Sequence, residues 1–396
     1  MKISYLFFIA LFIFSGSSKD DNLYVIDPRT FIERKITLAD IADDIKYIPL
    51  DNSIPFINLN CKITPNSIYV STKGTGIFKF DRQGKLIKKI GRQGRGPGEF
   101  MFGIDFTVDE KTGNVFVIDQ PNITKVYSQN GTFIRDISLN KIGEGAGFGA
   151  DIEIFNSLLF YPNSLGQGNS KYSWAFLDTL GNLVSRKENS VPPFQTRTGR
   201  EACIYKFENK LFYYNFFNDT IFSISPDLSY NAEYLFAQGD YRYPTKTIEQ
   251  NSISQYQNQL SKIFQPGKMF ETMHFIVLPF AYQHKLAILF IDKKTKRMFE
   301  ALKYENIPGS IAISKDCLIN DLDGGPPLES LSYYSENKAE YITTLINPFK
   351  LKLYIHSSEF INSLPKYPNK KIELEKLANS LKETDNPVLL IVKLKK

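Results

Sequence analysis

The sequence predicts an all-β protein, and three observations lead to that fold class. Phe and Tyr are abundant, with 32 and 22 copies, while clear helical stretches are few. Gly and Pro recur along the whole chain, as they do where short strands are joined by tight turns. A strand–turn–strand pattern also returns five times. With 396 residues, 42% of them hydrophobic, the chain can bury a large core, although length alone permits one large domain or several.

The repeated pattern is a hairpin: an alternating apolar strand, a short polar turn, and a second strand led by an aliphatic residue. Gly84, Gly131 and Gly181 fall in the first three turns, where a tight turn can need positive φ. The flanking residues alternate as in a half-buried strand. The five copies are "GIFKFDRQGKLIKKI" from Gly76, "TKVYSQNGTFIRDI" from Thr124, "SWAFLDTLGNLVSRK" from Ser173, "TIFSISPDLSYNAEYLF" from Thr220 and "KLAILFIDKKTKRMFEAL" from Lys285.

Another apolar strand precedes each hairpin, and a further candidate strand lies upstream of that one. The unit is therefore a four-stranded meander with strands a, b, c and d. Four-stranded units of roughly 45 to 65 residues are typical of a β-propeller, in which each blade covers its neighbour and ring closure removes exposed edges. The preceding strands are "SIYVST" from Ser67, "NVFVID" from Asn114, "SLLFYP" from Ser157, "KLFYYN" from Lys210 and "HFIVLPF" from His274, with upstream candidates such as "GIDFTVD" from Gly103 and "ACIYKFEN" from Ala202.

A sixth blade is predicted from both chain ends. The segment "KYIPL" at residues 46–50 looks like a strand d, yet it comes before any strand c. The C-terminal "NPVLLIVKLKK" from Asn386 would supply that strand c and close the ring. Strands a and b of this blade are sought in "GSIAISKDCLIND" from Gly309 and "KAEYITTLI" from Lys338. The prediction is a six-bladed β-propeller of four-stranded antiparallel blades, with its last blade shared by the two ends.

Two short helical insertions interrupt the strands, near residues 247–264 and 370–384. Ile248, Tyr256 and Ile263 in the first, and Leu374, Leu377 and Leu381 in the second, recur at largely helical spacing. We expect both helices to pack on the propeller. A role at a membrane surface is the alternative for either one.

Residues 1–18 have the layout of a secretory signal: a lysine, an apolar run, then small residues. The run is too short to span a bilayer comfortably, and no later run approaches the ~20 residues that a transmembrane helix needs. A first buried strand or a membrane anchor is the alternative. We expect an exported chain, in the periplasm or on the outer cell surface, with residues 19–396 forming one domain. The stretch also resembles a lipoprotein signal, but Ser17 stands where the lipid-bearing cysteine would fall, so a lipid anchor is not expected.

The stretch "GRGPGEFMFGIDFTVDEKTGNVFVIDQPNITKVYSQNGTFI" from Gly94 closely resembles an NHL repeat, the blade unit of a large class of propellers. Beyond that blade, "IADDIKYIPLD" from Ile41, "NDTIFSIS" from Asn218, "INDLDGGPPLESLSYYSEN" from Ile319 and the closing "LKETDNPVLLIVKLKK" resemble a family of secreted bacterial six-bladed β-propellers. These are NHL-like or TolB-like, often lipoproteins, and largely without a defined role. Two departures are Ser17 and "GGPPLESL" from Gly324, where the family usually has aromatic residues after the prolines. The resemblance implies the fold rather than a function.

Most catalytic classes find no support in the sequence. The three histidines lack zinc-site spacing, and the three cysteines form neither a C-x₂-C pair nor a disulfide framework. There is no G-x-S-x-G nucleophile motif. The net charge of +6 is scattered, so no nucleic-acid footprint is expected. No catalytic or metal-binding residue is predicted and no cofactor is expected, with calcium left open. Asp105, Glu153 and Asn218 could supply calcium ligands in the alternative, a calcium-dependent propeller hydrolase or lyase with its site at the central channel.

Binding is therefore the expected function. In a propeller the b–c loops and the d-to-a connections emerge on one face around the channel, and that face is where partners usually dock. We expect a peptide, protein or glycan to bind there, to a monomer. The predicted binding residues on this loop face are Arg92, Arg95, Gln120, Asn122, Asn163, Asn218, Tyr282 and His284.

The glycine-rich stretch "GRQGRGPGEF", residues 91–100, tests this interpretation most directly. A phosphate loop would need Gly-Lys-Ser or Gly-Lys-Thr and a following helix, whereas these glycines run into Glu99, Phe100 and a strand. Pro97 also removes a backbone donor. We therefore predict a d-to-a connection between the first two blades, with Glu99 accepting backbone or arginine hydrogen bonds and only Arg92 and Arg95 offered to a partner.

Overall fold

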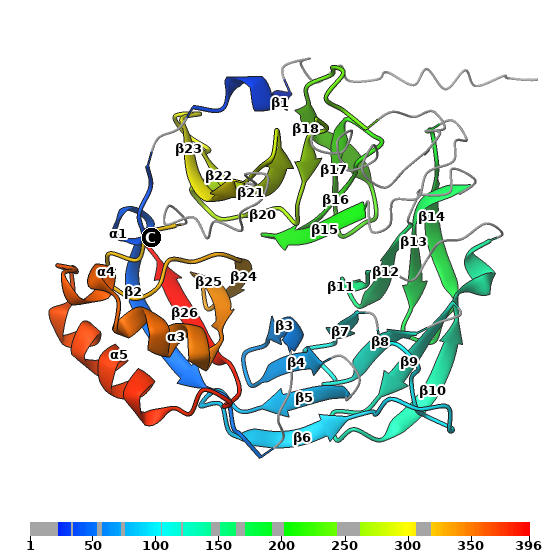
Figure 1. Ribbon diagram of the computed structural model, residues 1–396. Helices are drawn as coiled ribbons and strands as arrows, with labels where there is room; N and C mark the ends of the chain where they lie inside the picture. Colours follow the sequence, from blue (N-terminus) through cyan, green and yellow to red (C-terminus); the bar gives the residue numbers. More distant parts are fainter. Residues whose placement is uncertain are drawn as a thin grey trace, which may run out of the picture.

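The computed structural model is a ring of six β-sheets (Figure 1). It describes residues 23–32, 35–53, 58–72, 76–103, 105–119, 122–143, 151–163, 171–191, 202–243, 262–305 and 318–396. Each sheet is one blade, and its strands lie side by side from the ring axis to the outer edge, as the six-bladed prediction requires. The predicted fold class is confirmed.

Four blades follow the predicted order of consecutive antiparallel strands. Each of their hairpins turns where the sequence predicts it. The first has β3 (Asn58–Ile63), β4 (Ile68–Thr72), β5 (Gly76–Phe80) and β6 (Leu86–Ile90); the second β7 (Phe106–Val108), β8 (Val115–Asp119), β9 (Ile123–Tyr127) and β10 (Phe133–Ser138); the third β11 (Glu153–Phe155), β12 (Leu158–Pro162), β13 (Tyr172–Asp178) and β14 (Leu183–Glu188); the fourth β15 (Ala202–Phe207), β16 (Lys210–Asn215), β17 (Thr220–Ile224) and β18 (Tyr230–Phe236).

The fifth blade has a divided inner strand. Its main strands are β21 (Phe275–Tyr282), β22 (Lys285–Asp292) and β23 (Met298–Glu305). On the axial side, β19 (Gln265–Pro266) and β20 (Phe270–Glu271) each pair with β21. Lys268 lies in the short break between them.

The sixth blade closes the ring with both ends of the chain. Its sheet runs β24 (Ser332–Glu336), β25 (Ala339–Ile346), β26 (Val388–Leu394) and β2 (Ala42–Pro49), from the axis outward. The N-terminal β2 pairs antiparallel with the C-terminal β26, from Ala42 opposite Leu394 to Pro49 opposite Val388. The predicted closure by residues 46–50 and the C-terminal strand is therefore confirmed.

One strand of this blade was predicted wrongly. The inner strand is β24, not the segment from Gly309, of which residues 309–317 lie outside the described residues. Leu318 and Ile319 form only isolated bridges. The reason is local: Asn337 and Lys338 both have positive φ and make a tight turn that pairs β24 directly with β25.

The c–d turns show how sequence sets the hairpins. In the first blade Gly84 has φ +88°, and the Asp81 carboxylate accepts hydrogen bonds from the backbone amides of Gln83 and Lys85, both at 2.9 Å. The fourth blade uses Leu228 at φ +67° for the corresponding turn, without glycine. A residue with positive φ thus forms the turn even where the sequence has no glycine to indicate it.

The N-terminal segment contacts three consecutive blades, the fourth, fifth and sixth. β1 (Tyr24–Ile26) adds to the outer edge of the fourth blade, parallel to β18. The chain continues through a 3₁₀ turn, η1 (Pro28–Thr30), to Phe31, whose ring meets the rings of Phe264 and Phe280 edge-on at 6.1 and 5.2 Å. It then reaches the short α1 (Leu38–Ile41) and β2 in the sixth blade. The added strand β1 was not predicted.

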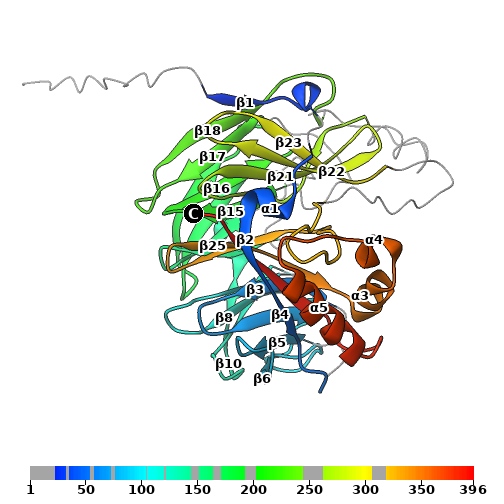
Figure 2. The same cartoon turned by 90° about the vertical axis from the view of Figure 1, so that its left-hand side faces the viewer.

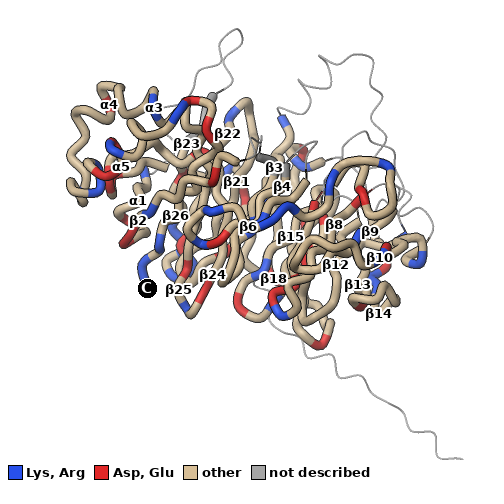
Figure 3. Tube along the Cα trace, turned by 90° about the horizontal axis from the view of Figure 1, so that it is seen from below, with Lys and Arg blue, Asp and Glu red and all other residues tan. Residues whose placement is uncertain are grey.

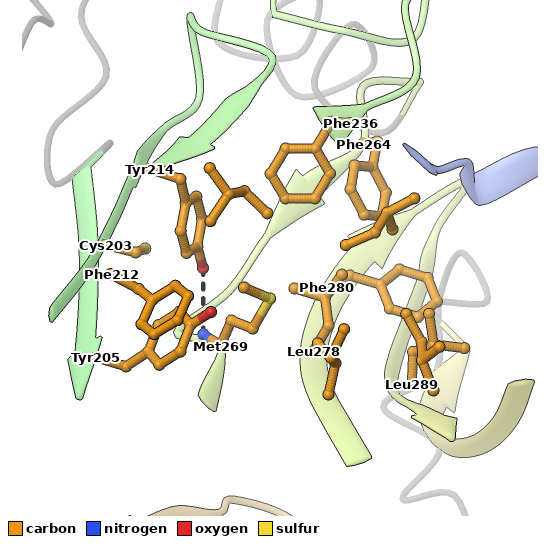
Figure 4. Packing of buried hydrophobic residues seen from close by; sticks show 14 of the residues in the cluster. Cys203, Tyr205, Phe212, Tyr214, Phe236, Phe264, Met269, Leu278, Phe280 and Leu289 are labelled. Atoms are coloured by element: carbon orange, nitrogen blue, oxygen red, sulfur yellow. Dashed lines mark hydrogen bonds between the residues drawn. The ribbon is translucent and has the colours of Figure 1, made fainter. Parts of the chain in front are cut away.

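Hydrophobic cores lie between neighbouring blades. Figure 4 shows one, in which Tyr214, Phe212 and Tyr205 from the fourth blade face residues of the fifth. The rings of Tyr205 and Phe212 stack at 4.6 Å, and the Tyr214 hydroxyl accepts a hydrogen bond from the Met269 amide at 3.2 Å. Trp174 is likewise buried in the core between the third and fourth blades.

Three helices join β25 to β26 and lie beside the closing blade (Figures 1 and 2). They are α3 (Pro348–Ile355), α4 (Ser358–Ile361) and α5 (Pro368–Ser380), and the 3₁₀ segment η2 (Leu139–Ile142) follows β10. The helix predicted near 370–384 is α5, with Leu374 buried as expected. α3 and α4 were missed. Most of the segment 247–264 lies outside the described residues. No helix of the described residues is long and apolar enough to cross a membrane.

Candidate functional site

The strands nearest the axis carry polar residues at alternating positions. β3 contributes Asn60 and Lys62, and equivalent pairs begin β7 and β11. Side chains two residues apart on a strand share a face, so each pair points the same way. The residues belong to five of the six blades, whose strands β3, β7, β11, β15 and β20 lie around the centre of Figure 1. We call this set the axial cluster: Asn60, Lys62, Asp105, Thr107, Asp151, Glu153, Lys206 and Lys268.

Glu153 is the hub of one half of the axial cluster. Lys62 Nζ donates to Glu153 Oε2 at 3.0 Å, and Lys206 Nζ lies 3.1 Å from Oε1. Thr107 Oγ1 donates to the same Oε1 at 3.0 Å. Burial alone would raise the pKa of Glu153, but the charges of Lys206 and Lys62 outweigh it and hold that pKa well below its ordinary value. Glu153 is therefore an anion throughout the physiological range, joining residues from four blades.

Asp105 and Asp151 form the other half. Asn60 Nδ2 donates to Asp105 Oδ1 at 2.5 Å, and the Ile152 amide lies 3.4 Å from Oδ2. Burial, the charge of Asp105 and a hydrogen bond between the two carboxyl groups raise the pKa of Asp151 to about 7, against the opposing charges of Lys268 and Lys62. The pair consequently gains or loses a proton near neutral pH.

Lys268 acts electrostatically on both carboxyl groups of this pair. Its side chain is exposed, and it forms no salt bridge with any described residue. Burial among surrounding protein would lower the pKa of Lys268, but the charges of Asp151, Asp105 and Glu153 raise it. A solvent-accessible cation thus lies close to three carboxyl groups without being bonded to one.

The predicted arginines lie on the loop between the first two blades. Residues 91–100 connect β6 to β7, as predicted. Glu99 accepts a hydrogen bond from the Gly96 amide at 2.8 Å and forms an ion pair with Arg92 Nε at 2.5 Å. These contacts confirm that Glu99 accepts backbone and arginine hydrogen bonds, as predicted. Arg92 keeps 73% of its side chain exposed, and Arg95 is also exposed. Both remain accessible to a partner.

The predicted amides have mainly structural contacts. Asn122 has φ +52° and its carbonyl accepts from the Leu139 amide at 2.8 Å, while Asn218 Oδ1 accepts from the Thr220 amide at 2.9 Å. Asn163 is fully buried and donates to the Tyr172 carbonyl at 2.7 Å. Gln120 lies outside the described residues. These asparagines hold turns, and whether they also bind a ligand stays a prediction.

Tyr282 and His284 lie at the β21–β22 turn of the fifth blade. The Tyr282 ring packs edge-on against Tyr241 and Phe264, each at 6.1 Å. His284 is exposed, with φ +63°. The predicted residues are thus divided among separate blades around the loop face, and the structure does not gather them into one site.

This chain is similar to one family of proteins and to several solved structures. A family model described as a domain of unknown function, DUF4934, matches residues 23–393. The chain belongs to the DUF4934 family. No curated protein matches the sequence. A crystal structure of a Bacteroides fragilis protein described as exported is similar to this DUF4934 chain, with a TM-score of 0.65 and 18% identity over 92% of this chain and 98% of that one.

A second solved structure, a DUF4221 family member from Bacteroides vulgatus, is similar with a TM-score of 0.51 and 12% identity, over 89% of this chain and 97% of that one. At these identities the likeness supports the fold alone. Both solved structures therefore share the fold of the DUF4934 chain, and its chemistry has to be argued from its own residues.

The calcium ligands considered for the alternative function separate in the DUF4934 structure. Asp105 and Glu153 both lie in the axial cluster, whereas Asn218 holds a turn of the fourth blade. The two Glu153 oxygens already contact lysines. Among the described residues, no group of three or more His, Cys, Asp or Glu side chains could hold a metal ion.

Sequence reasoning missed most of the axial cluster, although a signal was present. The segments "NCKI" from Asn60, "DFTV" from Asp105 and "DIEIF" from Asp151 each place polar residues two apart in a strand that begins a blade. Strand a is the innermost strand of each propeller blade, so this alternation points at the axis. Lys268 had no such signal, because it lies in the break of a divided strand.

Proposed function

We propose that this chain is an exported binding protein that holds a small polar ligand, such as a sugar or the end of a peptide, at the axial cluster. The observation that carries this proposal is the convergence of eight polar side chains from five blades on the axis. Grouping charges where they are partly removed from water is unfavourable unless the charges are paired. Lys268 forms no ion pair with any described residue. Polar groups that converge on a partly enclosed place suit the recognition of a polar ligand.

Export is supported by two observations. Residues 1–18 have the charged, apolar and small-residue order of a secretory signal. The similar protein from Bacteroides fragilis is described as exported. We propose the periplasm or the outer surface as the location, with Ser17 arguing against a lipid anchor.

The binding proposal is tested with an array of glycans and peptides and two matched variants. Lys206→Met removes an axial ammonium that is 44% exposed and paired with Glu153. Lys210→Met is the control, because Lys210 is 42% exposed and paired with Glu233 at 3.1 Å on the outer side of the same blade. We expect Lys206→Met to weaken binding and Lys210→Met to leave it unchanged. Equal binding by both variants would remove the axis from the site.

The same array tests the loop face. Replacing Arg92 and Arg95 by alanine removes two exposed cations from the connection between the first blades. A partner that docks on the loop face would bind this double variant more weakly, and one held only at the axis would not. Unchanged binding would exclude both arginines from the site.

A second candidate is a hydrolase or lyase, with calcium as its proposed cofactor. It is favoured by the Asp105–Asp151 pair, because a carboxyl group whose pKa is about 7 can both donate and accept a proton at neutral pH. Turnover of a bound ligand, together with a rise in melting temperature on adding calcium, would support it. A ligand recovered intact after long incubation would count against it.

A further inference from the structure

The helices beside the sixth blade expose a concentration of apolar side chains. Among the described residues fifteen large apolar side chains are exposed, and five of them lie between residues 349 and 372. Single exposed apolar residues are normal on a protein surface, whereas a group of them indicates an interaction surface. We call this group the helical patch: Phe349, Leu353, Ile361, Leu364 and Ile372.

The patch lies on the side of the helices that faces away from their own core. Figures 1 and 2 show the three helices outside the ring of blades. Phe349 and Leu353 are one turn apart on α3, and each is two residues from the buried Leu351, so both point to the opposite side of the helix. Leu364, in the connection from α4 to α5, is 98% exposed. The shared core contains Leu351 and Ile355 of α3, Phe360 of α4, and Leu374 and Ala378 of α5.

The segment that carries the patch is positively charged. Residues 347–372 contain five lysines and one glutamate, a net charge of +4 in a chain whose total is +6. Two of these lysines, Lys350 and Lys370, form ion pairs with Glu329 and Asp44. The other three, Lys352, Lys366 and Lys371, form no ion pair with any described residue. Positive charge therefore remains beside the apolar side chains.

The fold holds two of these three ammonium groups in place. Lys352 Nζ donates to the Leu381 carbonyl at 3.0 Å, and Lys371 Nζ donates to the Ser363 carbonyl at 2.9 Å. A carbonyl partner fixes the position of an ammonium group but leaves its charge uncompensated. The Lys371 contact also holds the connection that carries Leu364 against α5. The apolar and the charged parts of this surface are thus fixed relative to each other.

We propose that the helical patch docks this protein on an anionic phospholipid bilayer. The apolar side chains enter the boundary between headgroups and acyl chains, and the lysines contact the lipid phosphates. A surface that combines Phe and Leu side chains with neighbouring lysines matches both layers of that boundary. Each lysine close to an anionic bilayer strengthens binding about fivefold. This surface is separate from the axial cluster, and the inference goes beyond the proposed function.

A second copy of this chain is the competing occupant, and two features oppose it. Two copies joined through the patch would bring two positively charged surfaces together, and like charges across an interface repel. Leu364 also projects into the solvent instead of lining a groove. A lipid interface accepts a projecting side chain without a matching pocket, whereas a protein surface needs one. An anionic bilayer therefore fits this surface better.

The experiment is co-sedimentation of the full chain with vesicles of two compositions. One is pure phosphatidylcholine, and the other is an equal mixture of phosphatidylcholine and phosphatidylglycerol. We expect binding to the mixed vesicles in about 0.1 M salt, and binding weaker by about tenfold or more to the neutral ones. Raising the salt to about 1 M shortens the Debye length to about 3 Å and should weaken binding to the mixed vesicles.

Two pairs of variants assign the binding to the patch. Leu364→Gln should weaken binding to the mixed vesicles by about tenfold, because it removes an apolar side chain from the boundary. Leu180→Gln is its control, since Leu180 is 68% exposed on a turn of the third blade. Lys366→Gln should weaken binding about fivefold. Lys88→Gln on β6 changes the net charge equally and should bind as the wild type does. All four side chains are exposed, so the melting temperature should stay unchanged.

Four outcomes would overturn the proposal. They are absence of binding to the mixed vesicles, equal binding to both compositions, equal binding by Leu364→Gln and Leu180→Gln, and equal binding by Lys366→Gln and Lys88→Gln. Sedimentation velocity tests the competing occupant: a dimer that Leu364→Gln dissociates, without vesicle binding, would assign the patch to a second copy. None of these results involves the axial cluster, so the glycan and peptide array tests the proposed function separately.

Discussion

Replacing Asp151 with asparagine should raise the melting temperature at pH 8, and this gain should shrink toward zero as the pH falls toward 4. The folded state holds the pKa of Asp151 at about 7 through burial and the charge of Asp105, whereas an unfolded aspartate ionises near pH 3.9. A raised carboxyl pKa adds stability that is fully present below the unfolded value and is lost as the pH rises through the folded value. The asparagine side chain keeps the hydrogen-bond donor and cannot ionise.

The size of the effect follows from the difference between the folded and unfolded pKa values of Asp151. That difference of about three pH units corresponds to a change in the free energy of unfolding on the order of 4 kcal/mol. For 396 residues the unfolding entropy is about 0.8 kcal/mol/K near the midpoint, so the melting temperature should rise by about 5 °C at pH 8. Half of that rise would still exceed what an exposed carboxylate contributes.

The assay is thermal melting followed by circular dichroism between pH 5 and pH 8. Relative to Asp151→Asn, the wild type should lose stability as the pH rises from 5 to 7, and the difference should level off above that pH. Asp240→Asn, which changes an exposed carboxylate on a loop, is the control and should follow the wild type at every pH. Parallel curves for Asp151→Asn and the wild type would refute the proposed environment of Asp151.

The remaining predictions concern closure, turns and the helical insertion. Deleting β26 removes the partner of both β25 and β2, so the variant should be insoluble or lack a cooperative transition; a soluble protein with unchanged melting would refute closure. Gly84→Ala should lower the free energy of unfolding by roughly 1–3 kcal/mol, because φ is +88° and the new Cβ would lie against the Pro49 carbonyl. The control Gly96→Ala should lower it less, because its new Cβ meets only the flexible Glu99 side chain. Leu374→Ala in α5 should cost about 2–5 kcal/mol, because Leu374 is 1% exposed. Ile372→Ala on the same helix, 51% exposed, should change stability by less than about 0.5 kcal/mol in the same denaturation assay.

The fold was largely predictable because its strongest determinants are local. Alternation and turn glycines mark each hairpin, and Gly84 and Gly181 occupy the left-handed conformations expected of them. The closure could be predicted because a strand d without a strand c at one end requires a strand c at the other. β24 could not be found in the same way, because its turn at Asn337 and Lys338 carries no glycine. The same holds for β1, whose three residues pair with a distant strand.

The candidate site was harder to predict because it depends on which strands meet. Asp105 and Glu153 were considered from the sequence, but only as calcium ligands beside Asn218. Their actual neighbours are lysines from other blades, and Lys62 lies 91 residues before Glu153. No local pattern specifies such a contact. The loop-face residues were chosen by position in the blade, and the structure places several of them in turns where their backbone role is sufficient.

The polar axis has a competing explanation in the strand edges themselves. The innermost strand of each blade has an unpaired edge, and charged side chains are a common means of protecting edges from pairing with another chain. Edge protection needs charge on each strand, but it does not need the charges to meet. Here Lys62 of the first blade reaches Glu153 of the third, past the second, and Lys206 of the fourth blade reaches the same carboxylate.

Convergence therefore distinguishes a site from protected edges. If the charges only protected edges, repulsion between Asp105 and Asp151 would be a cost without a return, and nothing would favour an exposed Lys268 beside them. A polar ligand that contacts Lys268 would pair this charge, as the proposed function requires. The convergence therefore favours the proposed ligand site over protection of strand edges alone.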